Sequence, residues 1–380
     1  MTKMKTTEFK DRILNGDMDR RMFNKALAAV GLATVMQPMM SGNAKAAGDV
    51  NYFTWSGYDD PAFFQAYMAK YGGEPDYSFF GSEDEGLAKV RAGFKPTVGH
   101  PCSDTVSRWA RAGITKGIDT SRLSNYGGLY PELANLPGNS HNGEKVFVPF
   151  DWGNSSVIFR TDLVDPKYVE EHSWEILFDE RYAGRLATYN AAGGATAVAG
   201  LVLGHPTESL FAPNDDQLAA IREKLAQQQP LIRYYWDDQT TAEQGIASGE
   251  LVAAYAWNEA GVRLKEQGLP VEYMNPKEGI LFWVCGLSMF NSEYGAGNED
   301  AAYEMIDEMI SVDVGKYVIS EWGYGHSCRQ AFEETPEETL AELNLANPME
   351  MMKTGVFFQD VPDDINNKMQ EMWSEIQAGL

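Results

Sequence analysis

Residues 50–71 read VNYFTWSGYDDPAFFQAYMAKY, and this stretch predicts a strand, a turn and a helix in succession. Residues 50–55 are rich in aromatic and β-branched side chains, which favour a strand, and the Ser-Gly pair after them is typical of a turn. Pro61 suits the first turn of a helix, and the Gly-Gly pair after Tyr71 is expected to end it. The stretch therefore indicates an α/β unit.

The same alternation of strand and helix recurs along the chain, and the expected helices have apolar residues three and four positions apart. Further strands are expected at residues 145–150 and 157–160, and further helices at residues 84–92, 217–228, 301–319 and 363–378. The alternation predicts an α/β fold with mixed or mainly parallel sheets. Because no internal repeat and no long linker interrupts the pattern, we expect two lobes joined by strand-like crossovers.

The composition excludes several classes of function. The chain has 380 residues, 44% of them hydrophobic, which is long enough for two globular lobes and too apolar for intrinsic disorder. Its 55 acidic residues outnumber its 31 basic residues, which argues against binding to nucleic acid or to an anionic membrane surface. Three cysteines are too few for a scaffold built on disulfides.

The charge is unevenly distributed between the N-terminal segment and the rest of the chain. Residues 1–46 contain eight of the 31 basic residues and four of the 55 acidic ones. Residues 47–380 therefore have 23 basic and 51 acidic residues, a net charge of −28. The basic N-terminal segment is different in kind from the acidic chain that follows it.

This N-terminal segment has the form of a secretory signal peptide. Arg20 and Arg21 precede an apolar run at residues 26–36, which is shorter than the ~20 residues of a membrane span, and an Ala-x-Ala cleavage site ends at Ala46. The arginine pair resembles a twin-arginine signal, with the Sec route as the alternative. We expect cleavage after Ala46 and a mature protein in the periplasm.

The sequence contains no catalytic signature: G-x-S-x-G, H-E-x-x-H, the P-loop and the dinucleotide-binding motif are all missing. Its unusual feature is a set of tryptophans beside turn residues, namely Trp55, Trp152, Trp257, Trp283 and Trp322. Aromatic residues at strand ends are well placed to face a crevice at the edge of an α/β sheet. Because an aromatic face attracts an organic cation by ~0.5–2 kcal/mol, these residues predict a cation-binding protein rather than an enzyme. Ordinary packing in the core is the alternative.

A series of short motifs follows this pattern at residues 52–58, 118–123, 148–153, 162–166, 256–258, 276–283 and 323–325. In order and spacing the motifs resemble those of the periplasmic spermidine/putrescine-binding proteins of polyamine ABC transporters. The resemblance implies a type 2 periplasmic-binding fold, with two α/β lobes, a strand hinge and an inter-lobe ligand cleft that closes by hinge motion. The lobes would comprise residues 47–158 with 283–330 and residues 159–282 with 331–380.

The resemblance also implies a function in transport. It predicts a monomeric periplasmic receptor, without a cofactor, that binds a polyamine or a related small organic cation and delivers it to an inner-membrane ABC permease. A receptor for a quaternary amine, a betaine or a zwitterionic amine is one alternative. A periplasmic metal-handling protein and an exported enzyme are alternatives from other classes.

The family's ligand pocket is retained only in part. Its aromatic box matches Trp55, Tyr58, Trp257, Trp283 and Tyr324, and a further ligand contact matches Gln359. The family's carboxylates do not match, since Gly57 and Cys285 replace two of them and residues 188–194 contain no acidic residue. Asp104 and Asp151 instead stand in the pocket-lining stretches, where a helix cap or a hinge hydrogen bond is the alternative role for each.

An aromatic box with one or two carboxylates suits a compact cation, such as a short diamine, a quaternary ammonium compound or a zwitterionic amine. The candidate ligand-binding residues are Trp55, Tyr58, Cys102, Asp104, Asp151, Trp152, Trp257, Trp283, Cys285, Tyr324 and Gln359.

The three cysteines have more than one possible role. Two belong to His-x-Cys sequences, His100-Pro-Cys102 and His326-Ser-Cys328, which with Cys285 could form a soft metal site, although their spacing gives it little support. A disulfide between Cys285 and Cys328 is favoured over a metal site in an oxidising compartment. Burial as a small apolar side chain is the third possibility.

We predict that native protein recovered after export begins near Ala47, because the signal is removed after Ala46. N-terminal sequencing or intact-mass measurement tests this. A mature chain that still contains Arg20 and Arg21 would contradict the assignment.

Overall fold

The computed structural model describes residues 47–136, 138–343 and 345–380, all within one unit of the chain, residues 46–380. The predicted signal peptide, residues 1–46, lies outside the described residues. The strands are β1 (Asn51–Thr54), β2 (Asp76–Phe79), β3 (Val98–Gly99), β4 (Thr115–Lys116), β5 (Ser140–His141), β6 (Glu144–Lys145), β7 (Val148–Arg160), β8 (Leu186–Tyr189), β9 (Ile232–Trp236), β10 (Ala253–Trp257), β11 (Val271–Tyr273), β12 (Leu281–Phe290), β13 (Gly325–His326) and β14 (Val356–Phe357).

Helices alternate with these strands, as the sequence predicts. They are α3 (Gln65–Tyr71), α4 (Glu83–Arg91), α5 (Val106–Arg111), α6 (Pro131–Ala134), α7 (Lys167–Glu170), α8 (Ala192–Val202), α9 (Asp215–Gln228), α10 (Gln239–Ser248), α11 (Glu259–Glu266), α12 (Glu299–Met309), α13 (Val312–Tyr317), α14 (Arg329–Glu334), α15 (Glu337–Glu342), α16 (Pro348–Thr354) and α17 (Asp363–Gln377). Among the described residues, no helix combines the length and the apolar character that a membrane span requires.

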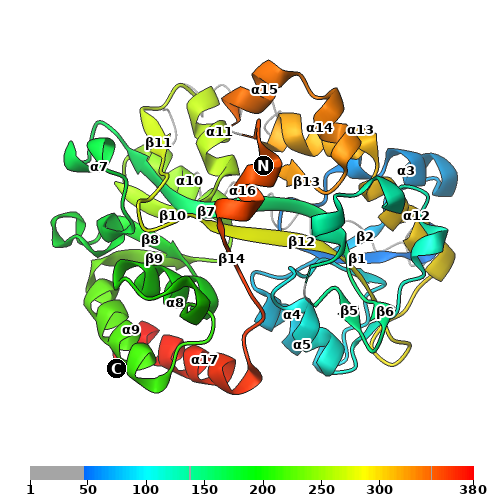
Figure 1. Ribbon diagram of the computed structural model, residues 1–380, viewed down its shortest axis with the longest axis horizontal. Helices are drawn as coiled ribbons and strands as arrows, with labels where there is room; N and C mark the ends of the chain where they lie inside the picture. Colours follow the sequence, from blue (N-terminus) through cyan, green and yellow to red (C-terminus); the bar gives the residue numbers. More distant parts are fainter. Residues whose placement is uncertain (1–46, 137, 344) are drawn as a thin grey trace, which may run out of the picture. The chain divides into compact units, whose positions relative to one another are not determined.

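Two long antiparallel strands connect the halves of the sheet. β7 and β12 pair from Leu281 opposite Ser155 to Leu287 opposite Val148, and Figure 1 shows them side by side across the middle of the view. Every residue of β7 except Arg160 is buried. Strand pairs therefore make the crossover between the lobes, as expected from the lack of a flexible linker.

Each lobe has its own part of the sheet, and the strand order is β2-β1-β3-β12-β7-β10-β8-β9. The β1 lobe is defined here by β1, β2, β3 and β4, of which β3 and β4 pair with the C-terminal end of β12. The β8 lobe is defined by β8, β9, β10 and β11, with β10 and β11 paired to β7. Parallel pairs within the lobes and antiparallel pairs at the crossover make the sheet mixed, which confirms the predicted α/β class.

Two predicted boundaries are wrong. Residues 148–150 and 157–160 of the two expected strands belong to one strand, β7, while Lys145 belongs to β6. The two parts are continuous because β12 and β10 pair with the polar residues between them and satisfy their backbone groups. The helix expected at residues 301–319 is interrupted, because the side chain of Ser311 accepts a hydrogen bond from the Val314 amide and begins the new helix α13.

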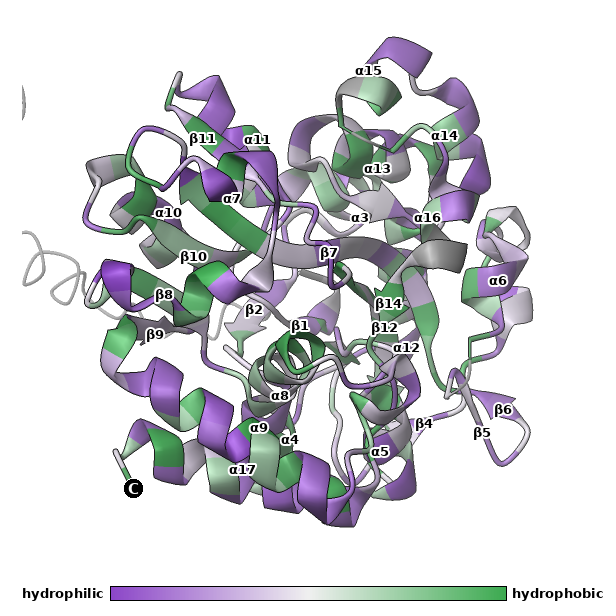
Figure 2. Cartoon of the chain, turned by 60° about the vertical axis from the view of Figure 1, so that its left-hand side comes forward, coloured by the Kyte–Doolittle hydropathy of each residue, from purple (hydrophilic) through white to green (hydrophobic). Residues whose placement is uncertain are grey.

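The C-terminal helix α17 belongs to the β8 lobe. Its Met369, Met372 and Trp373 are buried against Ile221 and Leu225 of α9. Figure 2 shows α9 and α17 next to each other, with hydrophilic and hydrophobic residues mixed along both helices, as is typical of amphipathic surface helices. This packing brings a segment distant in sequence to the edge of the cleft.

One glycine permits a close approach at the hinge. Gly325 in β13 pairs with Trp152 in β7, and an added Cβ at Gly325 would lie 2.0 Å from the Trp152 ring. Because Trp152 is fully buried, it has no free space into which it could move.

We expect Gly325→Ala to lower the free energy of unfolding by about 1–3 kcal/mol, the usual cost of overpacking a core. Gly127→Ala is the matched control, because an added Cβ there would have no atom within 4 Å. Urea unfolding of both variants measures the difference. An unchanged midpoint for Gly325→Ala would show that β13 can move away from β7 at little cost.

Candidate functional site

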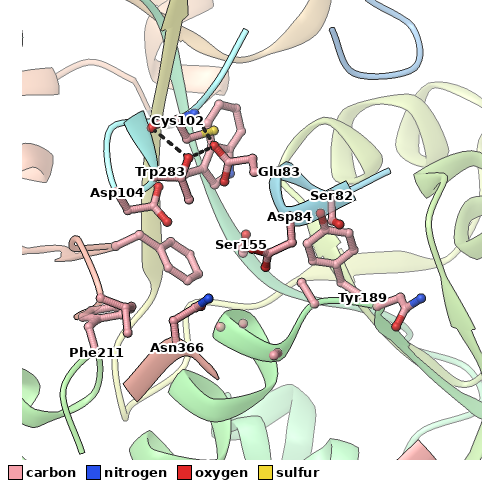
Figure 3. A pocket seen from close by; sticks show the side chains of 18 of the residues that line it. Ser82, Glu83, Asp84, Cys102, Asp104, Ser155, Tyr189, Phe211, Trp283 and Asn366 are labelled. Carbon is pink, nitrogen blue, oxygen red and sulfur yellow. Dashed lines mark hydrogen bonds between the residues drawn. The ribbon is translucent and has the colours of Figure 1, made fainter. Parts of the chain in front are cut away.

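A cavity of about 340 Å³ lies between the two lobes. Its walls include residues at the C-terminal ends of three strands: Trp55 follows β1, Tyr189 ends β8 and Trp257 ends β10. Figure 3 shows side chains from several elements converging on it, among them Glu83, Trp283 and Asn366. The carboxyl ends of strands in α/β sheets are the usual place for a ligand site.

Most of the sequence-predicted site residues come together here. Those that line the cavity are Trp55, Tyr58, Cys102, Asp104, Trp257, Trp283, Cys285, Tyr324 and Gln359. They come from both lobes and from the hinge strand β12, although they are spread over some 300 positions of the chain.

Asp151 and Trp152 do not line the cavity. Trp152 is fully buried, stacks on Phe332 with ring centroids 6.1 Å apart, and donates its indole N–H to the His326 carbonyl oxygen at 3.2 Å. Asp151 is 1% exposed and lies in the middle of β7. Pairing of β7 with β12 and β13 places both residues inside the hinge. The geometry therefore supports a structural role for each, namely core packing for Trp152 and hinge hydrogen bonds for Asp151.

Asp151 belongs to a buried polar network behind the cavity wall. It accepts a hydrogen bond from the hydroxyl of Tyr58, and its other oxygen lies 3.2 Å from Nε2 of His100. Nδ1 of His100 lies 2.9 Å from the hydroxyl oxygens of Tyr52 and Thr54. The network therefore connects β1, the loop after β3 and the hinge strand β7.

Aromatic rings from both lobes form the walls. Trp55 of the β1 lobe meets Trp257 of the β8 lobe edge to face, with centroids 6.2 Å apart, and Tyr189 lies 5.5 Å from Trp257. Trp283 and Tyr324 form a second edge-to-face pair at 4.9 Å. Edge-to-face contacts hold these rings in position, and a ring face turned to the cavity would attract a cation.

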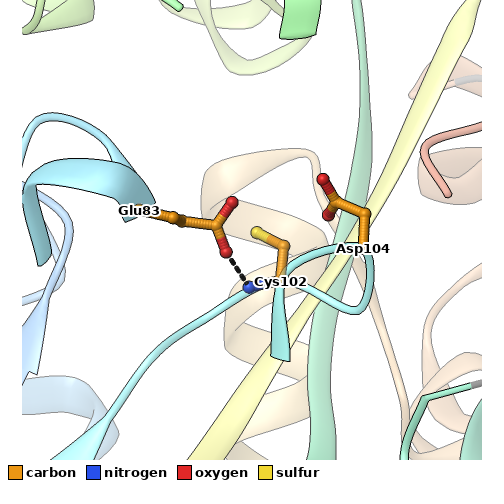
Figure 4. A group of neighbouring side chains, drawn as sticks. All are labelled: Glu83, Cys102 and Asp104. Carbon is orange, nitrogen blue, oxygen red and sulfur yellow. Dashed lines mark hydrogen bonds between the residues drawn. The ribbon is translucent and has the colours of Figure 1, made fainter. Parts of the chain in front are cut away.

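Two carboxylates lie together at one side of the cavity. Glu83 begins α4, and Asp104 lies in the loop between β3 and α5; Figure 4 shows them on either side of Cys102. Oxygens of both carboxylates and the Cys102 sulfur lie within 4.8 Å of one another. Asp104 is not the N-cap of α5, which is Thr105, so the helix-cap alternative does not apply to it.

Burial controls the electrostatics of this pair. Desolvation raises the pKa of Glu83, and repulsion by Asp104 adds to the effect, although Glu83 accepts hydrogen bonds from the Cys102 amide at 2.5 Å and from the Thr105 hydroxyl. Desolvation also raises the pKa of Asp104, which Arg108 partly offsets. The two groups therefore favour a nearby positive charge more strongly than solvated carboxylates would.

Further contacts join the lobes at the rim. The Tyr189 hydroxyl donates to the Gly81 carbonyl oxygen at 2.9 Å, and Arg111 of α5 forms ion pairs with Asp360 at 2.6 Å and Asp363 at 3.0 Å. The side-chain amide of Gln370 on α17 donates to Asp84 of α4 at 2.5 Å. The structure thus shows the lobes in contact around the cavity.

The family follows from comparison with known proteins. The model of the bacterial extracellular solute-binding proteins matches residues 81–342, which include most of the elements around the cavity. The chain belongs to this family.

Relatives of this solute-binding protein are similar along nearly their whole length. The chain is 25% identical over 357 residues to the spermidine/putrescine-binding periplasmic protein of Escherichia coli K12, covering 93% of this chain and 97% of the relative. It is 23% identical over 348 residues to the putrescine-binding periplasmic protein PotF of the same organism, covering 87% and 91%.

A solved structure agrees with the fold. The putative spermidine/putrescine ABC transporter protein of Listeria monocytogenes superposes with a TM-score of 0.75 at 19% identity, covering 86% of this chain and 98% of that one. The structural neighbours of this solute-binding protein have the two-lobe type 2 fold, which confirms the predicted fold class.

The structure corrects the cysteine pairing of this solute-binding protein. A disulfide joins Cys102 and Cys285, while Cys328 is free and buried, so the expected pairing of Cys285 with Cys328 is wrong. Pairing of the loop after β3 with β12 brings Cys102 opposite Cys285, whereas Cys328 pairs with Leu129 on another part of the sheet.

The disulfide also removes the basis for the mixed Cys/His metal site. With Cys102 and Cys285 oxidised, neither sulfur is available as a thiolate ligand. His326 contacts the Met309 carbonyl oxygen at 3.0 Å and the Cys328 amide at 3.1 Å, and burial lowers its pKa to about 4. These contacts occupy both of its ring nitrogens.

Glu83 is the main site residue that the sequence analysis missed. It lies just before the helix expected at residues 84–92, and 55 acidic residues in one chain make no single carboxylate stand out. Only the approach of α4 to the loop of Asp104 reveals its role.

We predict one free thiol per chain in the unfolded, non-reduced protein, and three after reduction, because only Cys328 is unpaired. Titration with a thiol reagent in denaturant measures the count. The double variant Cys102→Ser/Cys285→Ser should have a free energy of unfolding about 2–4 kcal/mol below that of the unchanged protein, which is the typical cost of losing a disulfide. Cys328→Ser is the control, and it should leave no titratable thiol before reduction.

Proposed function

We propose that this chain is the substrate-binding component of an ABC transporter and binds a polyamine or a related small organic cation in the cavity. The observation that supports this most directly is the combination of aromatic walls with the Glu83–Asp104 pair. The names of its relatives, which bind spermidine or putrescine, agree with that chemistry. The relatives are receptors for solutes, and we propose the same non-catalytic role here.

The charge of the cavity favours a cation. Its lining residues include four carboxylates, those of Glu83, Asp84, Asp104 and Asp360, against the guanidinium of Arg108. Arg108 forms an ion pair with Asp84 at 2.7 Å, and Arg111 binds Asp360 at the rim. Glu83 and Asp104 are thus the carboxylates left for a ligand.

The arrangement suggests how an amine would lie. One ammonium group would be placed between Glu83 and Asp104, where charge-assisted hydrogen bonds of ~1.5–3 kcal/mol are available. The alkyl chain would extend between the aromatic rings. The side-chain amide of Asn366, which also lines the cavity, offers an acceptor for a second polar group.

The wider role follows from the same proposal. The predicted signal at residues 1–46 would export the protein to the periplasm by the twin-arginine route, where it acts as a monomer. Lobes of residues 47–158 with 283–330 and of residues 159–282 with 331–380 would close on the ligand, and the closed form would deliver it to the inner-membrane permease. The function requires no cofactor.

We expect putrescine or spermidine at saturating excess to stabilise the protein by ~2–4 kcal/mol in a thermal-shift assay. Affinity should increase as the pH rises from about 4 to about 8, because burial raises the pKa of Asp104 to about 6 and that of Glu83 to about 8. The raised pKa values of Glu83 and Asp104 mean that both are protonated at low pH, and binding of a cation must release those protons.

Glu83→Gln should lower the affinity at least about tenfold and reduce the proton release, as measured by calorimetry in buffers of different ionisation enthalpy. Glu334→Gln is the matched control, because Glu334 is an exposed partner of Lys316 outside the cavity. If no amine shifts the melting temperature at any pH, the proposed ligand class is wrong.

A further inference from the structure

Among the four tyrosines that line the cavity, three share one property: their hydroxyl protons are directed away from the ligand space. Tyr58, Tyr189 and Tyr324 all line the cavity. Each donates its hydroxyl proton to a group that does not line it, namely Asp151, the Gly81 carbonyl and Glu259 respectively. A phenol whose proton is already donated can only accept a further hydrogen bond.

At Tyr58 the direction of the proton follows from the network around Asp151. The Tyr58 hydroxyl donates to Oδ2 of Asp151, so it keeps no proton for a ligand. With a proton on Nε2, His100 donates to the other oxygen of Asp151, and Nδ1 accepts from the hydroxyl of Tyr52 or Thr54. Both oxygens of Asp151 are then satisfied, although the side chain is fully buried.

At Tyr324 a second buried carboxylate has the same role. The Tyr324 hydroxyl donates to Oε2 of Glu259 at 3.2 Å, and Arg263 forms an ion pair with the other oxygen of Glu259. Burial raises the pKa of Glu259 to about 7, so the carboxylate is the main form at pH 8. Under those conditions Tyr324 also presents only lone pairs to the cavity.

The donors of Tyr189 and Trp55 have the same outward direction. The acceptor of Tyr189 is a backbone carbonyl, which has no proton to give, so its direction does not depend on pH. The indole N–H of Trp55 also points outward, donating to the His100 carbonyl oxygen at 3.0 Å. A ligand group that reaches one of these three phenol oxygens therefore meets an acceptor and not a donor.

We infer that the cavity selects cations with N–H groups over quaternary ammonium ions, and that Asp151 and Glu259 are positioning residues that act through Tyr58 and Tyr324. A quaternary ammonium ion could contact the aromatic faces, but it has no hydrogen for the buried phenol oxygens. It would desolvate those oxygens without replacing their hydrogen bonds, which is the most effective basis for rejecting a close analogue. The inference deepens the proposed function and rests on it.

The experiment compares the putrescine dication with its permethylated counterpart, in which methyl groups replace all three hydrogens on each charged nitrogen. Dissociation constants are measured by calorimetry at pH 8, where both compounds are doubly charged. We expect putrescine to bind at least about tenfold more tightly, the equivalent of one lost hydrogen bond to a charged group.

Variants separate hydrogen bonding from size. Tyr58→Phe should weaken the binding of putrescine and leave the binding of the permethylated compound unchanged. The ratio of the affinity for putrescine to that for the permethylated compound should therefore fall. If ligand size alone determined this ratio, it would not change. Asp151→Asn places a neutral amide beside Tyr58, and this amide can donate as well as accept. The change should lower the ratio of the two affinities, but only in a protein that still has the Tyr58 oxygen. The double variant should therefore match Tyr58→Phe in its ratio.

Tyr273→Phe is the control, since its buried hydroxyl donates to the carbonyl oxygens of Asn154 and Ala256 and does not line the cavity. Thermal unfolding of each variant without ligand confirms that it folds; if Asp151→Asn does not fold, Tyr58→Phe and Tyr324→Phe still test the ratio. Equal affinity for the two compounds would overturn the inference while leaving amine binding intact. Failure of both compounds to bind would overturn the proposed function instead.

Discussion

The antiparallel pairing of β7 with β12 is the constraint on which the rest of the structure depends. These strands cross between the lobes through the protein interior, where every backbone N–H and C=O must find a partner. Their mutual pairing, extended by β10 on one side and β3 on the other, satisfies those groups. The register of this pairing also determines the positions of Trp283 and Cys285, which line the cavity.

Burying a carboxyl group at the hinge costs free energy because the group loses its water, and hydrogen bonds from neighbouring side chains offset this cost. Asp151 lies in β7, which is buried at every position except Arg160, and it is stable there because two hydrogen bonds, from Tyr58 and from His100, replace its water. Glu83 also accepts two hydrogen bonds, but both go to Oε1, so a ligand charge could interact with its other oxygen and with Asp104. The contrast separates a carboxylate that supports the wall from carboxylates that await a cation.

The sequence predicted the site better than it predicted the connections between segments. Large aromatic residues beside turns are rare, so Trp55, Trp257 and Trp283 stood out, and all three line the cavity. The polar stretch inside β7 resembles a turn, and only pairing with two neighbours makes it a strand. The disulfide partner of Cys285 depends on a contact 183 positions away, which no local pattern encodes.

The position of α17 has a consequence for synthesis. This helix provides part of the cavity wall through Asn366 and Gln370, and Gln370 reaches across to Asp84 of the other lobe. It is translated after every other element that lines the cavity. A chain cut short before Asp363 would keep the pairing of β7 with β12 but would lack this wall of the cleft. An incompletely synthesised chain can therefore contain the hinge of this protein without its complete cavity.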